Sequence, residues 1–378
     1  CHHACADRAR LLRALAYARR RCGGALCIAG DLFEIGKIYE EEKNEIEQAK
    51  FYYEEALKID FGYVAVAKIL ADIYFREENW QRAESCLEVV VRDMEKTGER
   101  KEVARQYYRL GYIAEKLNDM QKAIRSYQAA YDLDPSYLPV MESLAIGYTQ
   151  LEMWDRASAI YQNMIVKQKD VLSDAEMVDI YYQIGDIERR LGNLEKALGF
   201  LRKGYEIDDR HVKILSLLKE IYAERQEWDE VYDMYLQLIS VVPEQERFDM
   251  YMELGSICTD KLNDVFRAID SYSGAMRSAK TPEQKQTAME KIYPLYMDAR
   301  QPQKAVTILK ELVQIDKDKD KQKQYYLKLA ELNHKSLSNL DEALVYYNRV
   351  LDIDPNYTQA FAEIEKILAD RRDWKGLE

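Results

Sequence analysis

One pattern of residues recurs along the chain, and it restricts the possible folds more than any other feature. Residues 119–137 read DMQKAIRSYQAAYDLDPSY, and residues 339–357 read NLDEALVYYNRVLDIDPNY. Between these stretches a small residue is followed about twelve positions later by alanine. An aromatic residue or leucine comes four positions after that alanine, as in Gly111, Ala123 and Tyr127. Recurrence at a fixed period predicts an array of similar structural units.

The period of the pattern is 34 residues. Units begin near residues 104 and 138, and again near residues 178 and 212. Nine units fit this frame, and a tenth begins at Tyr357. The largest insertion, Lys167–Glu176, separates the fourth and fifth units. Three units carry one extra residue, which we expect in the turn between their helices, at Asn44–Gln48, Lys261–Arg267 and Lys335–Glu342.

Each unit is predicted to be a pair of helices. The first helix of the third unit carries apolar and small residues at helical spacing, at Tyr107, Leu110, Gly111 and Ala114. The small residue lets the second helix approach closely, and the aromatic residue is expected to fill the gap between neighbouring units. Second helices are predicted to stop where a proline removes a backbone donor, at Pro135, Pro243 and Pro355.

Few residues in the chain would break such helices. The 378 residues include only 7 Pro and 15 Gly, a composition that favours an all-α protein. Pro294 falls inside a first helix of the eighth unit. We expect it to kink that helix, either as a hinge or as a local break without functional meaning. Helix pairs of this kind cannot bury their apolar faces alone, so they are expected to stack.

The 34-residue helix-turn-helix unit resembles the tetratricopeptide repeat, over about residues 29–378. The resemblance implies a right-handed superhelical solenoid of antiparallel helix pairs, with about nine full repeats and a partial tenth. It also implies a non-catalytic interaction scaffold. A partner protein or extended peptide would bind the concave groove that the first helices line.

The resemblance places seven candidate partner-binding residues on that groove: Phe75, Arg105, Tyr108, Arg109, Tyr112, Tyr182 and Arg189. Tyr and Arg combine rigid apolar area with forked donors, so they favour an acidic or extended peptide. In the alternative interpretation the tyrosines pack between units and the arginines pair with neighbouring Glu. The Lys and Asn that clamp chaperone tails in one subtype of the family are replaced in the third unit by Tyr108 and Tyr112.

The sequence predicts no catalytic group, cofactor or metal in the repeats. Gly30–Lys37 resembles a phosphate loop, but it has one residue too many and Ile38 replaces the Ser or Thr that would hold magnesium. His211 and His334 lie in different units and are expected to be exposed helix or turn residues. Asp316–Lys323 is a run of charges that we interpret as a solvated connection.

The two ends differ from the repeats. Residues 1–28 form a separate basic segment, interpreted as a cap, a leader or an artefact of the reading frame. A zinc site there is the weaker alternative, with ligands from Cys1, His2, His3, Cys5, Cys22 and Cys27. The tenth unit stops after Trp374, so we expect a piece of a longer protein. The alternative function is therefore a regulatory or substrate-recruiting region of a larger multidomain enzyme or signalling protein.

The overall composition restricts the possible partners. A net charge of −12 argues against nucleic acid, whose phosphates attract a cationic surface. No apolar run reaches the length of about 18 residues typical of a membrane span. The lone thiols Cys86 and Cys258 favour a reducing compartment and a cytoplasmic location. Open solenoid ends are a possible route to self-association.

Overall fold

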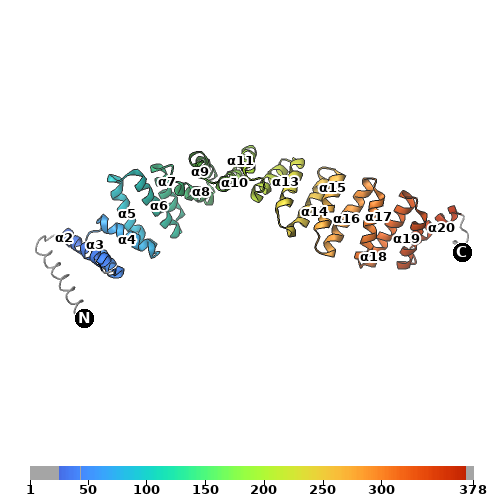
Figure 1. The fold of residues 1–378 in the computed structure, drawn as a ribbon, viewed down its shortest axis with the longest axis horizontal. Coiled ribbons are helices and arrows are strands. Elements are labelled where there is room, and N and C mark those ends of the chain that lie inside the picture. Colours follow the sequence, from blue (N-terminus) through green and yellow to red (C-terminus); the bar gives the residue numbers. More distant parts are fainter. Residues whose placement is uncertain (1–24, 43, 372–378) are drawn as a thin grey trace, which may run out of the picture. The chain divides into compact units, whose positions relative to one another are not determined.

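The computed structural model describes residues 25–42 and 44–371, and this part of the chain contains helices and no strand. The chain forms two compact units, the first ending at Asn193 and the second beginning at Leu194. Figure 1 labels the helices in chain order. The all-α expectation is confirmed. Most of the basic segment, the expected zinc ligands Cys1 to Cys22 and the end of the tenth repeat after Trp374 lie outside the described residues.

Within its described residues, the first unit holds four helix pairs and one further helix. Within it, each helix packs against the next one along the chain, as expected for a stack. Its elements are α2 (Ala25–Lys37) with the wider helical turn η1 (Ile38–Glu42), α3 (Ile46–Ile59), α4 (Val64–Arg76), α5 (Trp80–Thr97), α6 (Arg100–Lys116), α7 (Met120–Leu133), α8 (Leu138–Gln150), α9 (Trp154–Gln168) and α10 (Asp174–Arg190).

The second unit begins with the second helix of the fifth repeat and continues in the same manner. The described helices thus give the nine repeats and the partial tenth that the sequence predicts. Its elements are α11 (Leu194–Ile207), α12 (Val212–Glu224), α13 (Trp228–Val241), α14 (Glu244–Asp260), α15 (Val265–Ser278), α16 (Pro282–Asp298), α17 (Pro302–Ile315), α18 (Lys319–Glu331) with η2 (Leu332–Ser336), α19 (Leu340–Ile353) and α20 (Thr358–Arg371).

The turn inside each repeat has a fixed backbone form. Every described repeat places one residue with positive φ between its two helices: Asn44, Glu78, Asn118, Glu152, Gly192, Gln226, Asn263, Arg300 and Ser338. The left-handed conformation reverses the chain within a few residues, at a steric cost that Gly avoids and Asn tolerates. The turn therefore repeats by geometry rather than by residue identity.

The turn between repeats uses an aspartate. The carboxylates of Asp60, Asp134 and Asp208 each accept a hydrogen bond from the backbone N–H two residues later, at 3.0 to 3.1 Å. Asp316 and Asp354 do the same at 2.9 and 3.3 Å. This local bond satisfies a backbone donor where the second helix has ended. Pro135 and Pro355 directly follow two of these aspartates, as the predicted helix stops require.

The small residue and the aromatic residue of one repeat meet each other. A Cβ atom added to Gly111 would lie 2.4 Å from Cδ1 of Tyr127. A Cβ atom added to Gly36 would likewise meet the ring of Tyr53, and one added to Gly255 would meet the ring of Tyr272. The sequence predicted that this ring fills the gap between units, whereas each of these three contacts lies within one repeat. The ring fills the gap within its own repeat, because a small residue on the facing helix leaves room for it.

Neighbouring repeats are joined by a different bond. The hydroxyl of Tyr74 on α4 donates to Glu54 on α3 at 2.6 Å, and Tyr148 on α8 donates to Gln128 on α7 at 2.7 Å. In the second unit Arg202 donates to the hydroxyl of Tyr222 at 3.1 Å. Each bond joins a first helix to the second helix of the preceding repeat, so it sets how consecutive pairs stack.

Three repeats carry one extra residue each, and in them the backbone bond that closes the first helix spans one residue more. In a regular repeat a backbone bond closes the first helix five residues back, as from Asp119 to Ala114 at 2.9 Å. In the three longer repeats the bond spans six residues, from Glu45 to Tyr39, Asp264 to Cys258 and Asn339 to Asn333, at 2.8 to 2.9 Å. In two of the repeats the extra residue is absorbed before the turn, at η1 and η2, which corrects the expected placement there. In the seventh repeat α14 ends at Asp260, and the extra residue lies in the turn as predicted.

Two further expectations concern helix ends and breaks. Helix α16 continues through Pro294, so the predicted local break is wrong. The insertion around Lys167–Glu176 forms the connection after α9 and the start of α10. There Ser173 caps α10 and Glu176 bonds back to it, a capping box that fixes the first turn. No described helix combines the length and the apolar composition that crossing a membrane requires.

Candidate partner-binding surface

Three aromatic side chains gather between α4 and α6 in the first unit. The ring centroids of Phe75 and Tyr112 are 5.7 Å apart, and Trp80 lies edge-on to both rings at 5.4 and 6.0 Å. All three rings are half-buried. Such a cluster keeps apolar area at the surface in a fixed arrangement, which lowers the ordering cost of binding. We call Phe75, Trp80, Arg109 and Tyr112 the aromatic surface.

Arg109 belongs to this cluster through two contacts. Its guanidinium lies 5.1 Å from the Phe75 ring centroid and donates to the carboxylate of Asp72 at 2.6 Å. Lys116 lies 5.1 Å from the centroid of Tyr112. The alternative interpretation predicted that the arginines pair with neighbouring Glu. Arg109 does pair with a carboxylate, but the partner is Asp72 on the preceding first helix. The aromatic faces therefore carry positive charge.

The structure brings together three of the seven predicted residues, Phe75, Arg109 and Tyr112. Tyr108 instead packs against Tyr127 and Tyr137, at centroid distances of 5.7 and 5.5 Å. Burial raises the pKa of Tyr108 above its usual value. Arg105 is exposed and pairs with Glu102 of its own helix at 2.9 Å. These two side chains lie on the same helix but have different neighbours.

Tyr182 and Arg189 lie on α10, two repeats further along the stack. Trp80 was missed by the sequence analysis because it begins a second helix. A signal for it exists in the sequence, since Trp154 and Trp228 also begin second helices. Arg190 covers Trp154 at 5.2 Å, and Lys261 covers Trp228 at 5.4 Å. Cations over these tryptophans are therefore a recurring feature.

A separate pocket of about 270 Å³ opens between α8 and α10. Ile146, Tyr161 and Met164 supply apolar area from α8 and α9, and Leu172 adds to it from the connection. Carboxylates of Glu142, Glu176 and Asp179 also line it. Ile146 is half exposed at 50%, so it adds accessible apolar surface at this pocket. We call this feature the acidic pocket.

A second pocket, of about 290 Å³, lies among α3, α4 and α5 and includes Cys86. Burial, with a smaller contribution from Glu54, raises the pKa of the Cys86 thiol to about 11. A thiol that stays protonated at neutral pH is a poor nucleophile. The Tyr74–Glu54 bond that joins two repeats also borders this pocket. Its polar groups thus serve the stacking of the helices.

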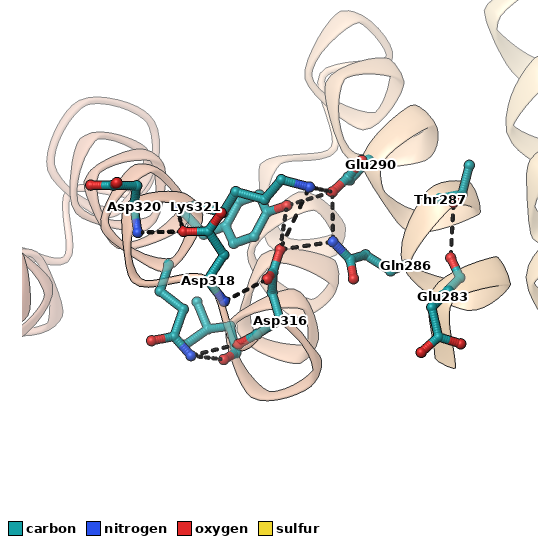
Figure 2. Close-up of polar contacts among 11 residues, drawn as sticks. Glu283, Gln286, Thr287, Glu290, Asp316, Asp318, Asp320 and Lys321 are labelled. Carbon is teal, nitrogen blue, oxygen red and sulfur yellow. Dashed lines mark hydrogen bonds and ion pairs between the residues drawn. The ribbon is translucent and has the colours of Figure 1, made fainter. Parts of the chain in front are cut away.

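A polar network links α16, α17 and α18 (Figure 2). Gln286 donates to Glu290 at 2.9 Å and to Asp316 at 2.7 Å, and Tyr325 donates to Glu290 at 2.6 Å. Burial alone would raise the pKa of Glu290. The bonds from Tyr325 and Gln286 and the charge of Lys321 outweigh it, so the pKa of Glu290 lies below its usual value.

This network corrects the interpretation of the charge run at its first residue, whereas residues 317–321 are exposed as expected. Asp316 is only 7% exposed, so it is not part of a solvated connection. One of its carboxylate oxygens accepts from the Asp318 backbone N–H at 2.9 Å, and the other accepts from Gln286. With both oxygens bonded, Asp316 holds the α17–α18 turn against α16. The carboxylates of Glu290 and Asp316 thus lie near each other because both accept hydrogen bonds that join these helices.

The histidines and the phosphate-loop resemblance also have structural explanations. His211 is the N-cap of α12, and its Nδ1 accepts from the Ile214 N–H at 3.3 Å. His334 is 17% exposed and lies 3.4 Å from Glu363, so the expectation of an exposed residue is wrong for it. Gly30 and Gly36 both lie within the helix α2, where Gly36 faces Tyr53. Within the described residues no cluster of three metal-ligating side chains occurs.

Four stretches match the profile of the tetratricopeptide repeat family: residues 32–63, 104–137, 178–211 and 324–357. They coincide with the first, third, fifth and ninth repeats. These four stretches are tetratricopeptide repeats. Comparison with curated proteins found no match.

Three of the solved structures that are similar to this chain share 13 to 16% sequence identity with it. YrrB, described as a TPR protein with an unusual peptide-binding site, has 16% identity and a TM-score of 0.37, with 53% of this chain and 96% of that chain covered. A tetratricopeptide repeat protein from Parabacteroides merdae has 14% identity and a TM-score of 0.37, with 84% and 98% covered. A Naa15/Naa10 complex bound to HypK-THB has 13% identity and a TM-score of 0.43, with 96% and 64% covered.

These TM-scores are low, so the fold assignment rests on the repeated helices of the chain and on the four family matches. Tetratricopeptide repeats generally serve as scaffolds for protein interaction, and this supports the same broad role for the chain.

Proposed function

We propose that the chain is a non-catalytic interaction scaffold, and that the aromatic surface binds an extended segment of a partner protein. The observation that carries this proposal is the cluster of three half-buried rings on adjacent repeats, with Arg109 lying over one of them. Aromatic residues and arginine are the side chains that most often anchor protein interfaces. Their arrangement on a stack of rigid helices keeps them in place before a partner arrives.

The charge at the aromatic surface favours a partner segment with acidic residues. Arg109 is held by Asp72, whose side chain is 49% exposed, so an incoming carboxylate can replace Asp72. A guanidinium binds a carboxylate through two parallel hydrogen bonds, which gives direction as well as affinity. Lys116, over Tyr112, adds a second positive charge beside the neighbouring ring. The preferred segment therefore combines an aromatic or aliphatic residue with a neighbouring Asp or Glu.

A direct test uses fluorescence polarisation with two short labelled peptides, one alternating Phe with Glu and one alternating Phe with Lys. The full chain is expected to bind the Glu peptide more tightly. The double variant Arg109→Glu, Tyr112→Ala should weaken that binding about tenfold or more, since both the charge and the ring are lost. The variant Asp72→Asn should strengthen it, because Arg109 loses its competing partner.

The matched control is Arg125→Glu, which makes the same charge change at an exposed position of α7. It should leave binding nearly unchanged, since exposed charges away from a site mainly affect association rates. Equal binding of the two peptides, or equal losses in the double variant and the control, would remove the assignment of this surface. Circular dichroism of each variant checks that the helices are retained.

A further inference from the structure

We propose that the acidic pocket between α8 and α10 is a second recognition site, which binds an apolar side chain flanked by Lys or Arg in a partner peptide. This site differs from the aromatic surface in position and in charge. Glu142 and Ile146 of the fourth repeat occupy the positions that Tyr108 and Tyr112 occupy in the third. The same face of consecutive repeats thus changes from aromatic and basic to aliphatic and acidic.

The shape of the pocket fits one apolar side chain. Tyr161 and Met164 are buried beneath it on α9, while Ile146 remains half exposed at its edge. Leu172, in the insertion between the fourth and fifth repeats, closes one side. The volume of about 270 Å³ suits a Leu, Ile or Met side chain together with part of its backbone. Filling the pocket would cover the exposed part of Ile146.

The charges at the pocket select the flanking residues. The lining includes Glu142, Glu176 and Asp179 but no Lys or Arg. Glu176 accepts two bonds from Ser173, and these lower the pKa of Glu176, so it is charged at neutral pH. Loss of water around Glu142 and repulsion from Glu176 raise the pKa of Glu142. No described Lys or Arg pairs with Glu142, so a cation supplied by the partner would relieve this repulsion.

The probes are three short labelled peptides with Gly and Ser at both ends and a central Lys-Leu-Lys, Glu-Leu-Glu or Lys-Ser-Lys. Binding to the full chain is measured by fluorescence polarisation at low salt. We expect the Lys-Leu-Lys peptide to bind about tenfold more tightly than either of the others, because it alone supplies both the apolar group and the cations. No measurable binding of that peptide, or equal binding of the Glu-Leu-Glu peptide, would overturn the proposal.

Two pairs of variants locate the binding. Glu142→Lys should weaken binding of the Lys-Leu-Lys peptide about tenfold, whereas Glu206→Lys makes the same charge change at an exposed position of α11 and should have little effect. Ile146→Ser should weaken binding several-fold, whereas Val166→Ser removes an exposed apolar side chain of α9 with little effect. Equal losses within either pair would exclude the acidic pocket.

The two recognition sites are tested independently. The double variant Arg109→Glu, Tyr112→Ala should leave Lys-Leu-Lys binding unchanged, and Glu142→Lys should leave binding of the Phe–Glu peptide unchanged or slightly stronger. Loss of both activities in one variant would show that the variant alters the fold, and circular dichroism would then detect it. A failure at one site therefore does not decide the other.

Discussion

The third and ninth repeats share a frame but differ at the side chain that faces the central tyrosine. In the third repeat Tyr127 packs on Gly111, and its hydroxyl donates to Glu115 at 2.5 Å. In the ninth repeat His334 takes the place of that glutamate. The hydroxyl of the corresponding Tyr347 is buried and has no hydrogen-bond partner among the described residues.

The residue type rather than the backbone explains this difference. The ninth repeat has a widened helix end, but the first repeat has one too, and there Glu40 of η1 still accepts from Tyr53 at 2.7 Å. His334 presents its ring to Tyr347 edge-on, at a centroid distance of 6.4 Å. Ring burial therefore defines the helix pair, and the hydroxyl bond adds stability where an acceptor is present.

The largest effect is expected when the third repeat is given the small residue of the ninth, which is Ala330. Gly111→Ala places a Cβ about where the Tyr127 ring lies, so we expect a loss of about 2 kcal/mol in the free energy of unfolding. The control is Gly199→Ala in α11, where nothing lies within 4 Å of the added atom. It should gain up to about 1 kcal/mol from helix propensity. Urea unfolding followed by circular dichroism measures both, and similar values would mean that Tyr127 adapts without cost.

The next effect is expected when the tyrosine hydroxyl is removed from each repeat in turn, because the third and ninth repeats should respond differently. Tyr127→Phe loses a bond to a charged acceptor and should cost about 2 kcal/mol. Tyr347→Phe removes a buried group without a partner and should be neutral or stabilising by up to about 1 kcal/mol. The measurement is urea unfolding at neutral pH. A larger loss at Tyr347 than at Tyr127 would contradict this account of the ninth repeat.

The alkaline pH dependence tests the same tyrosine. Burial, with Glu363 and Glu331, raises the pKa of Tyr347 from 10.0 to about 12. The unfolded chain then releases this proton at a lower pH than the folded chain, so stability is full below pH 10 and falls as the pH rises towards 12. At pH 11 the loss from Tyr347 is about 1 kcal/mol. Unfolding at pH 9 and pH 11 should show a smaller decrease for Tyr347→Phe than for the unchanged protein, and identical decreases would disprove the shift.

The smallest effect is expected at the turns. The third repeat places Asn118 at φ 61°, and the ninth places Ser338 at φ 54°. Asn tolerates this conformation better than Ser, so Ser338→Gly should stabilise by up to about 1 kcal/mol and Asn118→Gly by less. Thermal unfolding compares the two variants. A greater gain at Asn118 would show that the turn of the ninth repeat is not the more strained.

Much of the fold could be predicted, because its signals are local. Helical spacing, glycine and proline act within one repeat, so the nine pairs and the helix stops follow from the sequence. The candidate surface was predictable only in part. Phe75, Arg109 and Tyr112 were expected on one face, but the pairing of Arg109 with Asp72 joins residues of different repeats. Trp80 was missed because groove positions were counted on first helices alone.

The sequence by itself determined the period, the pairing of helices and the positions of the small and aromatic residues, because each depends on contacts within one unit of 34 residues. Only the tertiary structure decided which side chains meet across repeats. It buried Asp316 in a network with Gln286, and it opened the acidic pocket beside Ile146. These outcomes depend on distances between stacked helices, which the residue order of a single repeat does not encode.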